Sequence, residues 1–163
     1  MNVVRRFLVG LILLLVCSLA TAQEKVEHIQ TASPIATAVW AGDALYISGQ
    51  MASPITPADP AKGTPAVYGD TEAQAMSALT KIQNILKAQG LTMGDVVMMH
   101  VYMAGDPTNG GKLDFAGMMK SYTKFFGTPE QPNKPARSAM QVAALAAPWG
   151  LIEIEVIAVR SSK

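Results

Sequence analysis

The segments Pro135-Ala136-Arg137-Ser138 and Ile152-Glu153-Ile154-Glu155-Val156-Ile157-Ala158-Val159 decide the fold of this 163-residue chain. Both have the apolar character of buried β-strands, yet together they carry one guanidinium and two carboxylates. Charges in such segments are costly unless each has a partner in the protein or in a ligand. Arg137, Glu153 and Glu155 are therefore candidate site residues, and a structural ion pair is the alternative interpretation.

Strand alternation predicts which way these charges face, because residues two apart share one face of a sheet. In the last strand Glu153 and Glu155 lie opposite a uniformly apolar face made of Ile152, Ile154, Val156 and Ala158. In the strand before it, Arg137 shares a face with Ala139 and Gln141. We expect Arg137 and the two acids to share the sheet face that carries no helix.

The register of these two strands stays open. A tight hairpin centred near Ala147 would pair Arg137 with Ile157, which is about four residues, or ~13 Å, from Glu153. Glu155 would then be nearer to Arg137. A shifted or bulged register, or another route that brings Glu153 to Arg137, is the alternative.

The rest of the chain predicts two amphipathic helices and three further strands. Thr71-Glu72-Ala73-Gln74 is a capping box, and a stripe of Met76, Leu79, Ile82 and Leu86 follows it. The expected elements are a β-hairpin over 36–48, helices over about 71–90 and 113–126, and strands over 95–103, 136–143 and 151–159. Residues 26–33 form a lead to the hairpin, Gly49 ends it, and 54–69 is a Pro-rich loop.

The order ββ-α-β-α-ββ predicts an α+β sandwich in which both helices pack on one face of a mixed sheet. The second face then lacks a cover, and it mixes charges with Leu and Val. Such a mixture is typical of a surface that another subunit buries, so we expect an oligomer.

The N-terminus reads as a signal peptide. Arg5 and Arg6 precede an apolar run over 7–16, and Ala20-Thr21-Ala22 is a small-x-small cleavage site. Cleavage after Ala22 would leave one domain over 23–163 in the periplasm or outside the cell, without stable membrane insertion. An uncleaved anchor is the alternative, although the apolar run is shorter than the roughly 20 residues that span a bilayer.

Composition excludes some functions for this mature domain. Cleavage removes Cys17, the single cysteine, and leaves 11 basic against 12 acidic residues. A near-neutral domain without a Lys/Arg cluster argues against nucleic-acid binding. His100 with Met98, Met99 and Met103 suggests Cu(I), but alternation splits the set between two faces, so we predict core methionines and no metal.

Several motifs together resemble the RidA/YjgF family of reactive enamine/imine deaminases. The likeness runs from about Ile29 to Val159, and its most specific part is the P-A-R-S motif followed by I-E-I-E-V-I-A-V. In the same order stand A-G-D-A-L-Y-I-S-G-Q (41–50), G-D-V-V (94–97) and D-F-A…Y-T-K-F-F (114–126).

The resemblance implies a chorismate-mutase-like fold and a homotrimer whose sheets form a central barrel, with clefts between subunits. It also implies hydrolysis of 2-imino acids, formed from enamine precursors, to 2-oxo acids and ammonia without a cofactor. The ligand would be a small 2-imino or 2-oxo acid.

The resemblance assigns roles residue by residue. Arg137 matches the arginine that binds the substrate carboxylate, and Glu153 matches the acid that orients or activates water. Ser48 and Gly49 match pocket-lining positions. Ala139 stands where many members have cysteine, and its backbone carbonyl would hold the water. For Glu155 a structural role is the better interpretation.

Two substitutions set this chain apart from the family pattern. Ile35 stands where well-studied members carry tyrosine, and Met119 where they carry asparagine. Residues 54–69 are also longer than usual, and 147–150 replace a more polar turn. One hypothesis is a wider, more apolar pocket for a larger imino acid. The other is a catalytically inactive trimer that binds small carboxylates or acts like a chaperone.

Overall fold

The molecule, a computed structural model, is described over residues 25–161, so the predicted signal peptide and its cleavage site lie outside the described residues. Within these residues the chain forms six strands, two α-helices and three single-turn 3₁₀ helices. The strands are β1 (Val26–Ile29), β2 (Ala38–Ala41), β3 (Ala44–Met51), β4 (Val96–Met103), β5 (Ala136–Gln141) and β6 (Ile152–Val159). The helices are α2 (Thr71–Ala88) and α3 (Phe115–Tyr122), with 3₁₀ turns at Pro60–Lys62, Met93–Asp95 and Pro107–Asn109.

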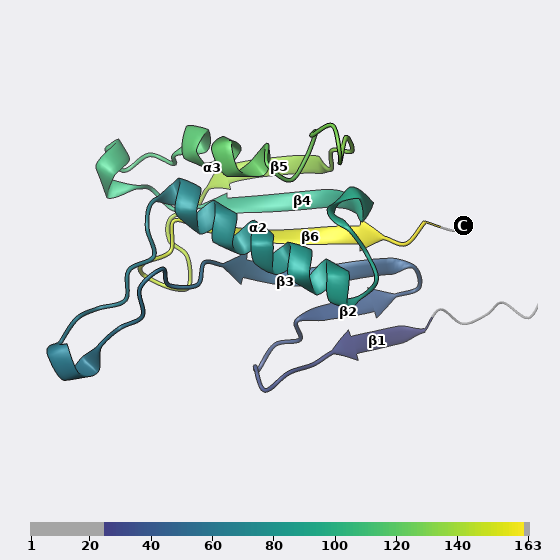
Figure 1. The fold of residues 1–163 in the computed structure, drawn as a ribbon, viewed down its shortest axis with the longest axis horizontal. Coiled ribbons are helices and arrows are strands. Elements are labelled where there is room, and N and C mark those ends of the chain that lie inside the picture. Colours follow the sequence, from purple (N-terminus) through teal and green to yellow (C-terminus); the bar gives the residue numbers. More distant parts are fainter. Residues whose placement is uncertain (1–24, 162–163) are drawn as a thin grey trace, which may run out of the picture.

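The six strands form one mixed sheet in the order β1-β2-β3-β6-β4-β5. Only β4 and β5 run parallel, and all other neighbours are antiparallel. Figure 1 shows α2 lying across the middle of one sheet face, with α3 beside it. The predicted α+β sandwich with two helices on one face is therefore confirmed. No helix within 25–161 is long and apolar enough to cross a membrane.

The core lies between the helices and the sheet. The apolar face predicted for β6 is fully buried there, since Ile152, Ile154, Val156 and Ala158 are all at most 2% exposed. Helix α2 contributes Ala75, Ala78, Leu79, Ile82 and Leu86. The helix begins one residue earlier than the capping-box interpretation requires, because Asp70 and not Thr71 is the N-cap, and its side chain accepts the hydrogen bond from Ala73 N at 2.9 Å.

Two boundaries differ from expectation. Residues 26–29 form the edge strand β1, which pairs antiparallel with β2. Its side chains are mostly exposed, so the pairing rests on the backbone ladder. Helix α3 ends at Tyr122, and the chain continues in turns to the buried Phe126. The predicted extension to 126 was wrong, because the helix gives way at Thr123 to turns that carry Phe126 into the core.

The tight hairpin considered for the last two strands does not form, and the two strands are not neighbours. Strand β6 lies in the centre of the sheet between β3 and β4, and β5 pairs in parallel with β4 at the edge. The physical reason is burial: β6 has an uninterrupted apolar face, whereas β5 is mostly exposed. A central strand buries more apolar surface than an edge strand, so the more apolar segment takes the centre.

The predicted common face for Arg137 and the acids is therefore also wrong. Arg137 lies opposite Met99, which is fully buried beneath the helices, so its side chain is on the helical face. Glu153 lies opposite Tyr102 on the other, open face. Alternation within each strand was predicted correctly, but the partner strand of β5 was not.

Candidate functional site

Arg137 is held by apolar and aromatic side chains of α3. Its guanidinium carbon lies 4.4 Å from the centroid of the Tyr122 ring and 5.6 Å from that of Phe115. Its Nη1 lies 3.2 Å from the sulfur of Met119 and 3.7 Å from that of Met118. Aromatic faces and thioethers attract a cation without neutralising it. The side chain is thus fixed while its charge stays available.

No acidic side chain among residues 25–161 lies within ion-pair distance of Arg137. The guanidinium borders a cavity of about 480 Å³, here called the guanidinium pocket. Its lining contains Lys134 as a second cation and no carboxylate; the lining residues are Met119, Tyr122, Thr123, Phe126, Gly127, Lys134, Pro135 and Arg137. A half-buried cation without a protein partner is suited to an anionic ligand, above all to a carboxylate that the planar guanidinium can bind with two hydrogen bonds.

Tyr122 adds a neutral hydroxyl to this pocket. Burial raises the pKa of Tyr122 above its ordinary value, although the positive charge of Arg137 lowers it. The net effect keeps the phenol protonated at neutral pH, so Tyr122 can donate a hydrogen bond and does not neutralise Arg137.

Glu153 belongs to a second group of residues, built around a bulge in β3. The register between β3 and β6 shifts between Ile47 and Gln50, so Gly49 lies within the strand and does not end it as expected. A Cβ added at Gly49 would collide with Oε1 of Glu153 and lie 2.8 Å from its Cδ. Glycine at this position is therefore what allows the carboxylate to lie against the backbone of β3.

Ser48 links the same bulge by a hydrogen bond to the loop that contains Ala36. Its Oγ donates to the carbonyl of Ala36 at 2.7 Å, and its own carbonyl accepts from Nε2 of Gln50 at 2.9 Å. Ile35 is the neighbour of Ala36 in this loop and is 63% exposed. Ser48, Gly49, Glu153 and Ile35 thus form one part of the candidate site.

Glu155 lies two residues further along β6 and is the centre of a hydrogen-bonded cluster. Its Oε1 lies 3.0 Å from His100 Nδ1 and accepts from the hydroxyl of Tyr102 at 3.1 Å. Desolvation, that hydrogen bond and the negative charges of Glu155 and Glu153 together raise the pKa of Tyr102. The open sheet face that carries these four side chains is here called the acidic face.

Sequence reasoning missed this cluster. His100 lies opposite Glu155 and Tyr102 opposite Glu153 only because β4 pairs with β6. Alternation along β4 puts His100 and Tyr102 on one face, and this pattern could have indicated that both contact the same neighbouring strand. A shallow cavity of about 280 Å³ on the acidic face is lined by Ser48, His100 and Glu155 among others.

The predicted site residues therefore fall into two groups within one subunit. Arg137, Met119 and Ala139 lie on the helical side, where Ala139 packs against the core opposite Val101. The other four predicted residues lie around the β3 bulge and the acidic face. Arg137 and Glu153 lie two strands apart and on opposite faces, so one subunit does not bring them together.

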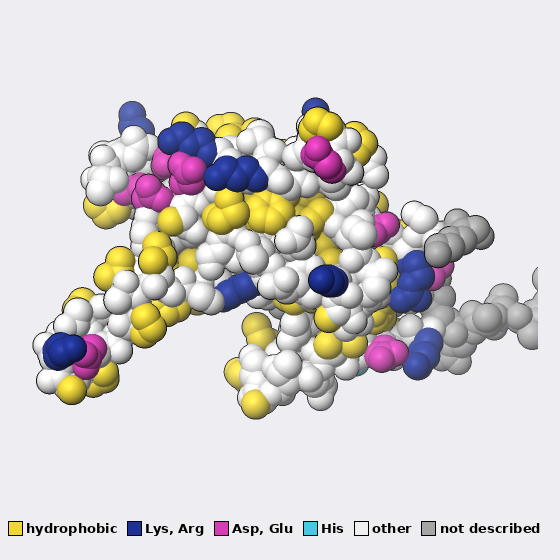
Figure 2. Space-filling view, viewed as in Figure 1, with side chains coloured by type: hydrophobic (Ala, Val, Ile, Leu, Met, Phe, Trp, Pro, Cys, Tyr) yellow, Lys and Arg dark blue, Asp and Glu magenta, His cyan; other side chains and the backbone are white. Residues whose placement is uncertain are grey.

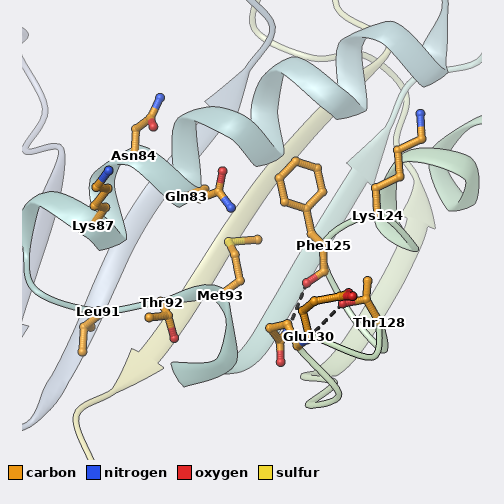
Figure 3. Close-up of a pocket in the computed structure, with 11 residues that line it drawn as sticks. Gln83, Asn84, Lys87, Leu91, Thr92, Met93, Lys124, Phe125, Thr128 and Glu130 are labelled. Atoms are coloured by element: carbon orange, nitrogen blue, oxygen red, sulfur yellow. Dashed lines mark hydrogen bonds between the residues drawn. The ribbon is translucent and has the colours of Figure 1, made fainter.

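A larger cavity, of about 700 Å³, contains none of the predicted site residues. It lies between the end of α2, the turn after it and residues 124–131, and Figure 3 shows Lys87 and Lys124 at its two ends. The dashed lines in Figure 3 are two hydrogen bonds that Gln131 makes to neighbouring residues: its N–H donates to Thr128 Oγ1, and its Nε2 donates to the Phe125 carbonyl. Some polar groups that line this cavity are thus already engaged in holding the loop over residues 125–131.

Metal-binding groups do not gather in the described part of the chain. Within 25–161, no three His, Cys, Asp or Glu side chains lie close enough together to hold a metal ion. Met99 and Met103 are fully buried in the core, whereas His100 lies on the acidic face. The methionine–histidine set is therefore split between faces.

Comparison with known proteins decides the family. The family model described as "Endoribonuclease L-PSP" matches residues 26–160. A goat (Capra hircus) protein named 2-iminobutanoate/2-iminopropanoate deaminase is 39% identical over 127 residues, covering 78% of this chain and 80% of its own. This chain belongs to the RidA/YjgF family.

Solved structures of RidA/YjgF proteins share the fold. A member of the YjgF family from Mycobacterium tuberculosis is 25% identical, with a TM-score of 0.61, and covers 83% of this chain and 100% of its own. Escherichia coli TdcF, solved with bound serine, is 32% identical, also with a TM-score of 0.61, and covers 83% and 99%. The RidA/YjgF fold thus accounts for the whole described domain.

Proposed function

We propose that this RidA/YjgF protein hydrolyses 2-imino acids to 2-oxo acids and ammonia. The observation that carries the proposal is the guanidinium of Arg137, which borders a cavity and has no acidic partner among residues 25–161. A 2-imino acid supplies the carboxylate that such a group binds. Relatives from goat, cattle and Salmonella typhimurium, 38–39% identical, carry the name of this deaminase activity.

The reaction needs a carboxylate clamp and a water activator. Arg137 would hold the substrate carboxylate and so fix the position of the adjacent imine carbon. Water adds to that carbon to give a carbinolamine. The C–N bond then breaks, ammonia leaves and the carbonyl forms. Glu153 would accept the proton of the attacking water and return it to the leaving nitrogen, as a carboxylate in a partly apolar site can do.

This division of roles requires more than one subunit. Arg137 and Glu153 lie on opposite faces of a single sheet, so the complete site would combine the guanidinium pocket of one subunit with the acidic face of another. The homotrimer that the family resemblance implies would supply this arrangement and would cover the open sheet face. The trimer is part of the proposal.

The side chains around the two groups favour an apolar substrate. Met119 contacts the guanidinium through its sulfur, and Ile35 is largely exposed beside the Ser48 loop. Both stand where well-studied members have polar side chains. A 2-imino acid with a larger aliphatic or aromatic side chain would make good use of these two residues.

A second candidate function rests on the same two residues. Without the tyrosine and asparagine, the site has fewer polar groups to orient water or the imine. The protein would then bind small carboxylates through Arg137 without turning them over, or act like a chaperone.

One assay separates the candidates. An amino-acid oxidase generates 2-imino acids from alanine, leucine or phenylalanine, and their lifetime is followed with and without this protein. The deaminase is expected to shorten the lifetime, and Arg137→Ala to abolish the effect. Arg160→Ala is the matched control, since Arg160 packs on Trp40 away from both groups. No acceleration with any imino acid, together with Arg137-dependent binding of 2-oxo acids in calorimetry, would favour the binder.

We also propose that the domain works in the periplasm or outside the cell, because residues 1–22 have the sequence pattern of a signal peptide. Mass spectrometry of the protein from its native host would then find Gln23 as the first residue. An N-terminus at Met1 would contradict the proposal.

A further inference from the structure

A cavity of about 570 Å³ lies at the end of the sheet where β3 and β4 finish and β6 begins. Three segments form its walls: the end of the 54–69 loop with the start of α2, the turn at 106–108, and residues 148–151. None of its lining residues belongs to the guanidinium pocket or is Glu153, Glu155, Ser48 or Gly49. The cavity is therefore separate from the proposed deaminase site.

The 54–69 loop is an organised arm. Bridges pair Thr56 with Val67 and Asp59 with Thr64, and Lys62 forms an ion pair with Asp59 at 3.0 Å. Figures 1 and 2 show the arm projecting away from the sheet. The base of the arm, residues 66–69, forms part of the cavity wall.

Two aromatic rings form one wall of the cavity. Tyr68 at the base of the arm stacks on Trp149, with ring centroids 3.5 Å apart and an angle of 3° between the planes. The buried amide of Gln74 fixes the backbone on both sides, because its Nε2 donates to the carbonyls of Gly69 (3.1 Å) and Trp149 (3.3 Å). Its Oε1 accepts from the N–H of Leu151 at 2.9 Å. The wall is thus formed before any ligand arrives.

The charge of the cavity is negative. Asp106 and Asp70 are among its lining residues, and no Lys, Arg or His is. Asp106 is only 5% exposed, and no basic side chain within 25–161 lies at ion-pair distance from it. Its Oδ1 accepts from the N–H and the hydroxyl of Thr108, both at 2.7 Å, whereas Oδ2 has no hydrogen-bond donor among the described residues. Since no buried side-chain oxygen among the described residues lacks a hydrogen-bond partner, Oδ2 reaches solvent, where a cationic donor can approach it.

We propose that this cavity binds a primary ammonium ion that carries an apolar, aromatic tail. The ammonium donates to Oδ2 of Asp106, and the tail packs on the Tyr68–Trp149 pair and on Pro148. Aromatic faces add cation–π attraction for the same charge. Anions are excluded by Asp106 and Asp70, so the cavity is not a second site for the 2-oxo acid.

Calorimetry with three isosteric probes tests the proposal. 2-Phenylethylamine carries the ammonium, 2-phenylethanol is neutral, and phenylacetate is an anion. The amine is expected to bind at least about tenfold more tightly than the alcohol, and phenylacetate is expected to show no binding at this cavity. Asp106→Asn keeps the Oδ1 acceptor for Thr108 and should weaken the amine by about tenfold or more. Asp43→Asn, at an exposed turn, is the matched control and should leave the affinity unchanged.

Tryptophan fluorescence locates the ligand. In a Trp40→Phe background Trp149 is the remaining tryptophan, so binding of the amine should change its emission. Equal affinity for the amine and the alcohol, or no binding of the amine, would overturn the proposal without any variant. Amine binding that survives Asp106→Asn but is lost in Glu153→Gln would place the ligand on the acidic face and would also overturn it.

Discussion

The guanidinium pocket and the acidic face carry opposite charges and are built in different ways. Arg137 is fixed by rings and thioethers from one short helix, and its charge has no protein partner among the described residues. On the acidic face, Glu155 is surrounded by donors, and Glu153 lies in a recess that glycine leaves open. The guanidinium is held by aromatic rings and thioethers, and the Glu153 carboxylate occupies space left by the missing side chain of Gly49. The two groups are complementary in charge.

The difference teaches that the fold separates Arg137 from Glu153 and does not pair them within one subunit. A carboxylate within reach of the guanidinium would pair with it and compete with a ligand for its charge. In the proposed mechanism, this separation would keep each charge free until two subunits assemble. The proposed site would therefore exist only in the assembled oligomer. Substitutions that disable either the guanidinium pocket or the acidic face test this idea.

The largest effect is expected for Arg137→Ala. Removing the carboxylate clamp should lower kcat/KM for a 2-imino acid by about 10³-fold, because two charge-assisted hydrogen bonds are lost. Arg137→Lys should recover only a small part, since an ammonium lacks the planar fork. Steady-state kinetics in the oxidase-coupled assay measures both. A wild-type rate in Arg137→Ala would remove the guanidinium pocket from the mechanism.

Glu153→Gln should lower kcat by about 10²-fold with little change in KM, because it removes a proton acceptor but not the clamp. Mixing then tests the shared site. Subunits with Arg137→Ala, co-expressed with subunits carrying Glu153→Gln, should form trimers in which about one site in four is intact and should recover about a quarter of the wild-type activity. Mixed trimers as inactive as either parent would mean that both residues act within one subunit.

Gly49→Ala should have an intermediate effect. The added Cβ meets the carboxylate of Glu153, so the variant is expected to lose about tenfold in kcat and about 1–3 kcal/mol in the free energy of unfolding. Gly94→Ala is the matched control, because a Cβ there finds no atom closer than 3.4 Å. Thermal melts and kinetics on both variants separate a displaced carboxylate from a general intolerance of alanine.

The smallest effect concerns Tyr102, whose pKa is raised in the folded protein. The folded state therefore holds the phenolic proton more tightly than the unfolded chain, where the pKa is about 10. The resulting stabilisation is complete below pH about 10 and is lost as the pH rises through the higher folded value. Tyr102→Phe should accordingly make the Tm less sensitive to pH above about 10. An unchanged alkaline profile would mean that this hydroxyl does not contribute.

Much of the fold could be predicted from local patterns. The apolar face of β6 and three of the four stripe residues on α2 (Leu79, Ile82 and Leu86) were predicted correctly, because both patterns depend only on periodicity within one segment; Met76 is only half-buried. The neighbour of β5 could not be predicted in this way. Its six residues alternate as a strand whether they pair with β4 or with β6, and the choice is made by burial summed over the whole sheet.

The candidate site shows the same limit. Arg137 and Glu153 were identified as charges in apolar strands and by the family motif; Arg137 borders a cavity, and Glu153 lies against the backbone of β3 at Gly49. Their common face was mispredicted, because faces can be compared between strands only once pairing is known. The Tyr68–Trp149 wall was also missed, since its rings are 81 residues apart in the chain and approach through two loops.

The amide of Gln74 has a consequence for how the chain folds. It forms hydrogen bonds with residues 75 and 77 positions further along the chain. It therefore connects α2, a helix formed by local contacts, to the loop that precedes the last strand, β6. Contacts of such long range form late in folding. Gln74→Ala should therefore leave the refolding rate nearly unchanged and accelerate unfolding, so that the kinetic lifetime of the native state, more than its formation, depends on this one side chain.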